Sequence, residues 1–389
     1  MPVITEIADL KRIYKRRVPR MFYDYAETGS WSEQTFRENT SDFDKLYFRQ
    51  RVAVDMTGRT TTSQLAGQDV SMPVALAPVG LLGMQSADGE IKAAQAAEDF
   101  GIPFTLSTLS ICSIEDVAAR TTKPFWFQVY TLKDDDFMTR LLARAKDAGV
   151  ETIVITLDLQ LMGQRHKDIK NGLSAPPKPT LSNMVNLATK IPWGLEMLGT
   201  PRRTFRNVVG HAKGVNDPGS LASWTAQAFD QSLDWDRVAE LRRMGDGKVI
   251  VKGIMDAEDA HRAINAGADA IIVSNHGGRQ LDGALSSIRA LEPVVDAVGD
   301  KVEIHLDSGI RSGQDILKAL ALGARGVMIG RAMVYGLGAM GKKGVSEALR
   351  VLQKELEYTM ALAGRTSIDA IDRDILHVPK GFAGDWDRP

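Results

Sequence analysis

Short apolar runs recur along most of the chain, and a polar, glycine-containing loop and a segment of helical periodicity follow each of them. Runs of roughly 4–8 apolar residues between turn residues are typical of buried parallel strands. Eight strands are predicted, over residues 73–78, 104–107, 125–130, 152–158, 248–253, 270–275, 302–307 and 326–330. Helices are predicted between them, over residues 86–100, 114–119, 134–148, 234–244, 256–266, 284–298 and 313–322.

Strands that alternate with helices imply right-handed crossovers and a parallel sheet. Eight such units favour an α/β fold of the (β/α)₈ or TIM barrel type, in a single domain over residues 1–389. The alternative is an open, doubly wound sheet, which is expected to carry G-x-G-x-x-G after its first strand. The loop at 77–83, APVGLLG, lacks that spacing.

Four segments complete this organisation. An N-terminal extension covers residues 1–70, with short helices at 7–16 and 18–26 and a strand at 48–54. The barrel itself comprises residues 71–165 and 233–335. The insertion at 166–232 interrupts it after the fourth strand, and a helical tail follows over 336–389.

Composition narrows the function classes. The 389 residues are 44% hydrophobic and carry a net charge of -1, so no overall field favours nucleic acid. The single cysteine, Cys112, excludes a disulfide framework within the chain. The first twenty residues lack a secretory apolar core, and no window approaches the roughly 18 apolar residues of a membrane span. We therefore expect a cytoplasmic protein.

The stretch 274–283, SNHGGRQLDG, directly follows a predicted buried strand. It carries His276, a base that titrates near neutral pH, and Arg279, which can clamp a carboxylate. Barrel strands converge on one mouth at their C-terminal ends, where catalytic residues lie. The pair indicates chemistry at the α-carbon of a small organic acid, the alternative being a solvated surface loop.

Two further loops predict a phosphate site. Asp307-Ser308-Gly309-Ile310-Arg311 and Gly330-Arg331 end the seventh and eighth strands and lead into helices, where anions bind. The remaining strand ends bring neutral hydrogen-bonding groups and one cation, which suit a polar heterocycle better than a metal. These residues are Ser107, Gln128, Thr156 and Lys252.

These blocks resemble a known family. SNHGGRQLDG, together with SMPVALAPVGLLGM, WFQVY, VIVKGI, DSGIR and IGR, is similar to the FMN-dependent L-α-hydroxy-acid oxidases and dehydrogenases, and most of all to their bacterial, respiratory, lactate-oxidising members. The resemblance implies FMN as cofactor, no metal, and oxidation of an L-2-hydroxy acid, foremost L-lactate, with electrons passing to a quinone. Oxygen as acceptor and a larger acid such as mandelate stay open. Two other functions also stay open: a barrel lyase or isomerase that acts on a phosphorylated substrate, and a non-catalytic flavin- or small-acid-binding protein.

The resemblance also implies residue roles and a homotetramer. His276 is the base, and Asp158 stabilises its imidazolium. Tyr130 binds the substrate hydroxyl, and Lys252 stabilises negative charge on the reduced ring. The substrate carboxylate is bound by Tyr25, Arg165 and Arg279. The flavin ring is held by Ala77, Pro78, Val79, Gly80, Ser107, Gln128, Thr156 and Ser274. The ribityl chain and phosphate are held by Asp307, Ser308, Gly309, Ile310, Arg311, Gly330 and Arg331.

Two positions bear on specificity. Leu109 stands where glycolate oxidase carries tryptophan, which leaves room for an α-substituent larger than hydrogen. Gly80 stands where the oxidases usually carry alanine, which favours an acceptor other than oxygen.

The insertion predicts a membrane contact. After a proline-rich start at 175–179, an apolar strip at 191–199 precedes a basic patch at 201–206. An apolar segment flanked by arginines is typical of peripheral binding to anionic lipid. We expect residues 190–206 to contact the cytoplasmic face of the inner membrane, the alternative being a lid packed on the barrel or on a neighbouring subunit.

Overall fold

The predicted eight strands form one parallel sheet that curves into a barrel. The computed structural model describes residues 3–173, 180–216, 220–221, 224, 227–245 and 247–383. The strands are β4 (Val74–Leu76), β5 (Thr105–Ser107), β6 (Trp126–Tyr130), β7 (Thr152–Thr156), β8 (Lys248–Ile254), β9 (Ala270–Val273), β10 (Glu303–Leu306) and β11 (Gly326–Ile329). Their order is β4-β11-β10-β9-β8-β7-β6-β5, and a parallel bridge between Leu76 and Phe104 joins the two ends. The TIM barrel prediction is confirmed.

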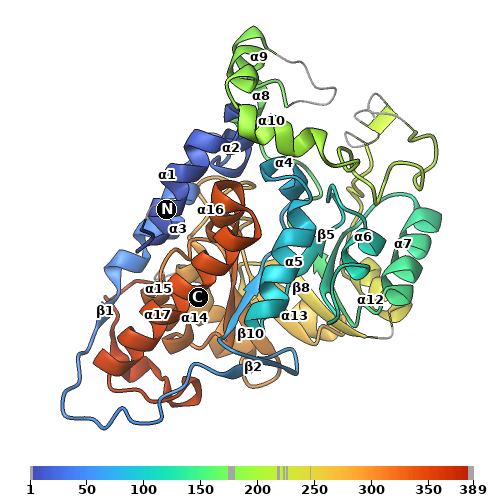
Figure 1. Ribbon diagram of the computed structural model, residues 1–389. Helices are drawn as coiled ribbons and strands as arrows, with labels where there is room; N and C mark the ends of the chain where they lie inside the picture. Colours follow the sequence, from blue (N-terminus) through green and yellow to red (C-terminus); the bar gives the residue numbers. More distant parts are fainter. Residues whose placement is uncertain are drawn as a thin grey trace.

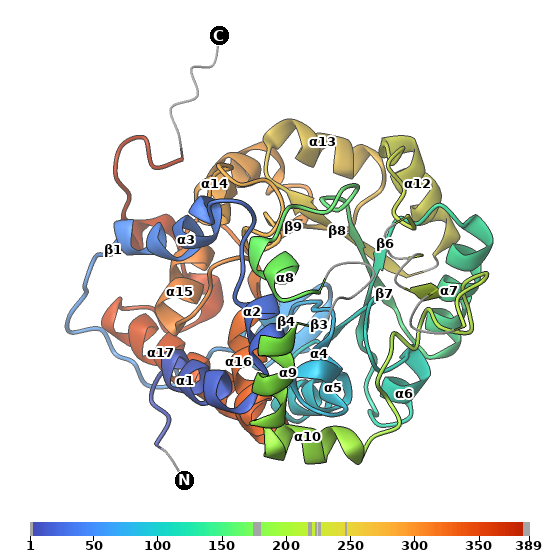
Figure 2. The ribbon, with the colours of Figure 1, turned by 90° about the horizontal axis from the view of Figure 1, so that it is seen from above.

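A ring of helices covers the barrel, as Figure 2 shows from above. Strands rich in Val, Ile and Leu are buried throughout because the sheet has helices outside and packed side chains inside. Acceptor side chains at the N-caps, such as Asp134 and Ser312, fix several helix starts. The ring consists of α5 (Gly89–Phe100), α6 (Ile114–Ala118), α7 (Asp135–Asp147), α12 (Trp235–Met244), α13 (Ala257–Asn265), α14 (Ser287–Val298), α15 (Gly313–Ala321) and α16 (Arg331–Met340).

A hairpin that the sequence pattern did not reveal closes the N-terminal end of the barrel (Figure 1). It consists of β2 (Ser63–Leu65) and β3 (Gln68–Val70). Its turn residue Ala66 donates its N–H to Glu303 Oε2 at 2.7 Å and accepts from Lys248 Nζ at 2.6 Å. His305, fully buried, lies 3.2 Å from the same carboxylate. The hairpin thus covers the end of the barrel opposite the mouth at which the strands end.

The prediction of an N-terminal strand over residues 48–54 is wrong. The extension contains α1 (Ile7–Arg17), α2 (Arg20–Ala26), α3 (Gln34–Ser41) and the 3₁₀ turn η1 (Phe43–Lys45). Only β1 (Tyr47–Phe48) pairs, with β12 (Leu376–His377). Beyond it, Arg51 donates its N–H to Leu362 O, so the chain follows the end of a helix and not a strand. The tail contains α17 (Lys342–Leu362), η2 (Ile368–Ala370) and η3 (Arg373–Ile375).

The insertion places α8 (His166–Lys170), α9 (Leu181–Ala188) and α10 (Ile191–Leu198) over the open mouth, beside α2 and α4 (Leu82–Gln85) (Figures 1 and 2). The apolar strip is therefore a helix with two faces. Trp193 points inward and donates Nε1–H to Met84 O at 2.9 Å. The proline-rich segment 175–179 lies outside the described residues. Within those residues, no helix combines the length and apolarity needed to cross a bilayer.

Candidate active site

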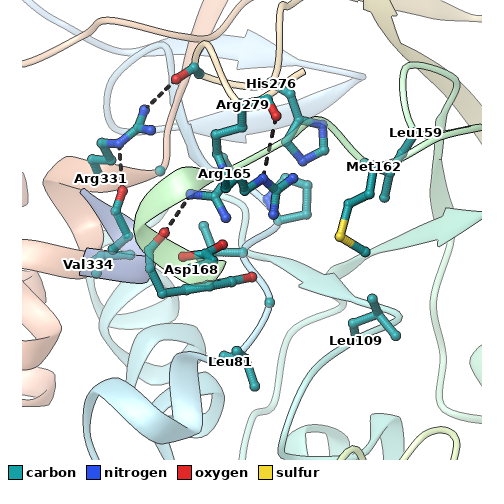
Figure 3. Close-up of a pocket in the computed structure, with 18 of the residues that line it drawn as sticks. Leu81, Leu109, Leu159, Met162, Arg165, Asp168, His276, Arg279, Arg331 and Val334 are labelled. Carbon is teal, nitrogen blue, oxygen red and sulfur yellow. Dashed lines mark hydrogen bonds between the residues drawn. The ribbon is translucent and has the colours of Figure 1, made fainter. Parts of the chain in front are cut away.

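A cavity of about 710 Å³ opens at the C-terminal mouth of the barrel (Figure 3). Most of the predicted site residues line it: Tyr25, Ala77, Pro78, Val79, Gly80, Leu109, Tyr130, Arg165, Lys252, His276, Arg279, Asp307, Ser308, Gly309, Ile310, Arg311, Gly330 and Arg331. The others do not line the cavity but lie buried or part-buried at the same strand ends: Ser107, Gln128, Thr156, Asp158 and Ser274. The fold thus gathers residues that are up to three hundred positions apart in the chain.

The strand register sets the floor of the cavity. Tyr130, Thr156 and Lys252 lie side by side on β6, β7 and β8, at one level of the barrel. The buried Lys252 Nζ donates to Ser274 Oγ at 2.8 Å and lies 3.3 Å from Asp307 Oδ2. Burial by itself lowers the pKa of Lys252, but Asp307 and Asp158 outweigh it, and the pKa is raised. Lys252 therefore stays protonated at the floor of the cavity, where it is paired with Asp307.

His276 and Asp158 form a hydrogen-bonded pair at the wall. His276 Nδ1 lies 2.9 Å from Asp158 Oδ1. Burial raises the pKa of Asp158, but His276 and Lys252 oppose it and hold the pKa below its usual value. An ionised carboxylate only accepts hydrogen bonds, so Nδ1 carries the hydrogen and Nε2 keeps its lone pair. Burial, aided by Lys252 and Arg165, lowers the pKa of His276, which is therefore neutral near pH 7 and able to accept a proton.

The loop that carries His276 has an unusual backbone. His276 has φ of 58°, in the left-handed region that non-glycine residues seldom adopt. Gly277 continues in that region, and a Cβ there would lie 2.5 Å from Arg331 Nη1. The Gly277 N–H also donates to Ser308 Oγ at 2.8 Å. Glycine is favoured at position 277 by its φ of 69°, and Arg331 donates Nη1–H to Gly277 O at 3.0 Å, which fixes the loop that carries the imidazole.

Two guanidinium groups face the cavity beside the imidazole (Figure 3). Arg279 lies 4.7 Å above the Tyr25 ring and donates Nη1–H to Tyr25 O at 2.5 Å. Arg165 donates to Gln280 Oε1 at 3.3 Å. Burial, together with the neighbouring Arg279, lowers the pKa of Arg165 to about 10. Buried cations this close together favour a bound anion, such as a substrate carboxylate.

Asp168 is a site residue that sequence reasoning missed. It lies on α8 near both arginines in Figure 3 and is 9% exposed, and burial raises its pKa. Its Oδ1 has no hydrogen-bond partner among the described residues. Its position three residues after Arg165 at the start of a helix was the available signal.

The second arginine cluster lies where the phosphate was predicted. Arg331 begins α16 and donates to three backbone carbonyls, those of Ala26, Thr28 and Gly277, at 2.8–3.0 Å. Burial, followed by the repulsion of Arg311, lowers the pKa of Arg331 to about 10. A helix N-terminus and paired arginines provide charge and N–H donors for a phosphate group.

Two buried polar atoms on β6 and β7 have no hydrogen-bond partner among the described residues. Gln128 Nε2 and Thr156 Oγ1 make no hydrogen bond within the described part of the chain. The Ser107 hydroxyl donates to Gln128 Oε1 at 3.0 Å, which leaves the amide nitrogen of Gln128 free. Buried groups of this kind normally have partners, so a polar ligand is expected here. The amide, the hydroxyl and the nearby ammonium of Lys252 fit the polar edge of a flavin ring, and the arginines fit its phosphate.

The far side of the cavity is apolar. Leu81, Leu159, Met162 and Phe229 line it together with Leu109. Phe229 also packs edge-on against Tyr130, with ring centroids 5.4 Å apart. Leu109 was predicted from the sequence, but the other four residues were missed. Leu81, Leu159 and Met162 lie beyond the strand ends, outside the strand pattern, and Phe229 belongs to the insertion. Among the described residues, no group of His, Cys, Asp and Glu forms a metal site.

A barrel mouth with this arrangement defines a flavin-dependent oxidoreductase that acts on small hydroxy acids. Comparison with known proteins agrees with this class: residues 14–378 match the model of the FMN-dependent dehydrogenase family. The chain belongs to that family, and it is an FMN-dependent oxidoreductase of 2-hydroxy acids. The lyase and the non-catalytic binding protein are thereby excluded.

Relatives in sequence and in structure cover nearly the whole chain. It is 43% identical over 381 residues to L-lactate dehydrogenase of Pseudomonas syringae pv. syringae, covering 96% of this chain and 98% of that protein. It is 45% identical over 378 residues to L-lactate dehydrogenase of Actinobacillus pleuropneumoniae serotype 5b, with the same coverages. The crystal structure of the monotopic membrane protein (S)-mandelate dehydrogenase superposes with a TM-score of 0.92 at 34% identity, covering 97% of this chain and all of that one.

Proposed function

We propose that this protein oxidises L-lactate to pyruvate and passes the electrons to a membrane quinone. The observation that carries the proposal is the neutral His276, paired with Asp158, facing the same cavity as Arg165 and Arg279. A 2-hydroxy acid whose carboxylate binds the arginines presents its C2 carbon to the imidazole. The similarity to L-lactate dehydrogenases supports lactate among such acids.

In this proposal each side chain has one task. Arg279, Tyr25 and Arg165 hold the carboxylate, and the Tyr130 hydroxyl binds the substrate hydroxyl. His276 Nε2 takes a proton from the substrate, and Asp158 stabilises the imidazolium that results. Both direct hydride transfer and initial proton abstraction require a neutral His276.

FMN, when bound, supplies the acceptor for the two electrons. Lys252 places a fixed positive charge beside the expected polar edge of the flavin ring, where it would stabilise negative charge. Gln128, Thr156, Ser107, Ser274 and the Ala77–Gly80 backbone would hold the ring. Asp307, Ser308, Gly309, Ile310, Arg311, Gly330 and Arg331 would hold the ribityl chain and phosphate.

A larger substrate is the second candidate. The apolar side of the cavity, with Leu109, Leu159 and Met162, offers space for an aromatic α-substituent. The similarity in structure to (S)-mandelate dehydrogenase supports the same possibility. Comparison of kcat/KM for L-lactate and (S)-mandelate decides between the two acids.

The visible spectrum tests the reaction and the acceptor in one experiment. We expect the purified protein to be yellow and to be bleached anaerobically by L-lactate but not by D-lactate. After bleaching, a short-chain ubiquinone should restore the colour at least about tenfold faster than air, a difference of roughly 1.4 kcal/mol in barrier. A colourless protein, or a yellow one that no 2-hydroxy acid bleaches, contradicts the proposal, and faster recovery in air assigns oxygen as acceptor.

We infer peripheral membrane binding through the outer face of α9 and α10. This face exposes apolar side chains, each 41–78% accessible: Leu181, Met184, Val185, Leu187, Ile191, Leu195 and Leu198. The exposed apolar surface is smaller than the predicted strip, because Trp193 faces inward. The predicted basic patch is partly neutralised, because Arg202 and Arg206 both form ion pairs with Asp116. Ile169 on α8 is exposed and also lines the cavity, so a quinone would enter on the side of the insertion. A face of this kind and the monotopic relative support a location at the cytoplasmic face of the inner membrane.

Two leucines on this face provide the test. Leu181→Glu/Leu195→Glu should bind vesicles containing phosphatidylglycerol about a hundredfold more weakly, since each buried leucine contributes roughly 1.5–3 kcal/mol. Leu362→Glu, at an equally exposed leucine on α17, is the control and should bind as the unaltered protein does. Co-sedimentation measures the binding, and equal binding by all three proteins would contradict the inference.

A further inference from the structure

The apolar side of the cavity is built by two neighbouring loops. Leu81 lies in the loop after β4 and Leu109 in the loop after β5, and Figure 3 shows both away from His276 and Arg165. A 2-hydroxy acid held by its carboxylate, with C2 beside His276, directs its α-substituent toward this side. The distance between the two loops therefore controls the size of substituent that fits.

Glu90, near the start of α5, binds both loops from behind. It is fully buried. Its Oε1 accepts the N–H of Gly83 at 3.1 Å and of Ile111 at 2.9 Å, and its Oε2 accepts that of Cys112 at 3.3 Å. A buried carboxylate is costly unless it is hydrogen-bonded. The donors to Glu90 are these three backbone N–H groups and the Cys112 side chain, and all belong to the two segments that carry Leu81 and Leu109. One side chain thus determines where both loops lie.

The two loops also pack closely against each other. Leu81 donates its N–H to Leu109 O at 3.3 Å, and Leu109 donates its own to Ser107 Oγ at 3.2 Å. A Cβ on Gly83 would lie only 2.5 Å from the Ile111 Cβ. Because the packing is this close, a shift of Ile111 or Gly83 is transmitted to Leu109 and Leu81.

We propose that Glu90 is a positioning residue that selects the α-substituent of the substrate by holding the Leu81 and Leu109 loops together. Glu90 does not line the cavity and acts through its hydrogen bonds to these two segments. The proposal rests on the proposed function, because it assumes a 2-hydroxy acid bound with its α-substituent against these leucines.

Two substitutions remove the hydrogen bonds of Glu90 to a different extent. Glu90→Gln keeps an oxygen for Gly83 and Ile111 but turns an amide NH₂ toward the Cys112 N–H, whereas Glu90→Ala removes every acceptor. We expect the ratio of kcat/KM for (S)-mandelate to that for L-lactate to rise about threefold in Glu90→Gln and tenfold or more in Glu90→Ala, since pocket changes of this size shift discrimination by roughly 10–200-fold. In both variants, the change in this ratio should arise mainly from a higher KM for L-lactate.

Asp42→Asn is the matched control. Asp42 is an equally buried carboxylate that accepts a hydrogen bond from Ser286, away from the cavity. Its substitution should lower the thermal midpoint and leave the substrate ratio unchanged. If the Glu90 variants lose stability to the same degree and also keep the ratio, Glu90 has only a structural role and the proposal is wrong. Should Glu90→Ala fail to fold, Glu90→Gln decides alone.

Ligand binding separates this proposal from the proposed function. Flavin absorbance changes give dissociation constants for pyruvate and phenylglyoxylate, the 2-oxo acids that match the two substrates. If the unaltered protein binds neither acid, the proposed function fails. If it binds them and the Glu90 variants keep the same ratio of dissociation constants, only the role of Glu90 fails.

Discussion

His276→Ala is expected to lower kcat for L-lactate by about 10²–10⁴-fold, the usual contribution of a general base. The imidazole presents an available lone pair at Nε2, because Asp158 fixes the hydrogen on Nδ1. FMN should stay bound, since neither the arginines nor Lys252 depends on this side chain. Stopped-flow measurement of flavin bleaching isolates the step. His305→Gln, which removes another buried histidine at a distance from the cavity, should retain activity.

The pH profile of the unaltered enzyme supplies an independent check. Because the pKa of His276 is lowered, the imidazole is neutral at pH 7, and kcat/KM should fall only as pH drops through that lowered value. Two results would contradict the assignment of His276 as the base. One is flavin bleaching by His276→Ala within twofold of the rate of the unaltered enzyme. The other is a fall in kcat/KM that begins well above pH 6.5, the ordinary histidine pKa.

Arg331→Ala is expected to yield a protein that is largely free of FMN and clearly less stable. Loss of a buried charge partner costs about 2–5 kcal/mol, so FMN affinity should fall by roughly 30-fold or more. The same guanidinium connects α2, the segment at Thr28 and the His276 loop, and each carbonyl left unpaired costs about 1–3 kcal/mol. Fluorescence titration of the apoprotein with FMN and thermal unfolding measure the two effects.

Two further variants distinguish the effect of the positive charge at position 331 from that of the guanidinium hydrogen bonds. Arg331→Lys keeps a positive charge but cannot reach three carbonyls, so it should recover part of the FMN affinity and little of the stability. Arg325→Ala, at a surface arginine paired with Asp369, should alter neither. Full FMN affinity in Arg331→Ala would place the phosphate elsewhere.

The strand pattern was sufficient to predict the barrel and most of the cavity lining. Parallel strands in a barrel end at the same mouth, so residues that follow each apolar run must converge. His276, Lys252 and Arg331 were found in this way. Tyr25 and Arg165 lie outside the strand pattern and were identified only by family resemblance.

Other features depended on contacts between distant segments. The inward orientation of Trp193 follows from its hydrogen bond to Met84 O, and the early end of β1 follows from pairing with β12. Glu90 lies near the start of α5, where an acidic side chain favours the helix N-terminus. Its hydrogen bonds to Ile111 and Cys112, some twenty residues away, exist only because two loops pack on α5.

The sequence by itself determined the barrel, the mouth at which its chemistry lies and the residue types available there, because strand and helix periodicities are local properties of the chain. The tertiary structure alone decided which groups face the cavity and which support it from behind. Among the described residues, Gln128 and Thr156 keep atoms without a hydrogen-bond partner. Arg331 donates to carbonyls of three segments, and Glu90 accepts hydrogen bonds from two. Burial and hydrogen bonding between segments far apart in sequence are set only when the barrel closes.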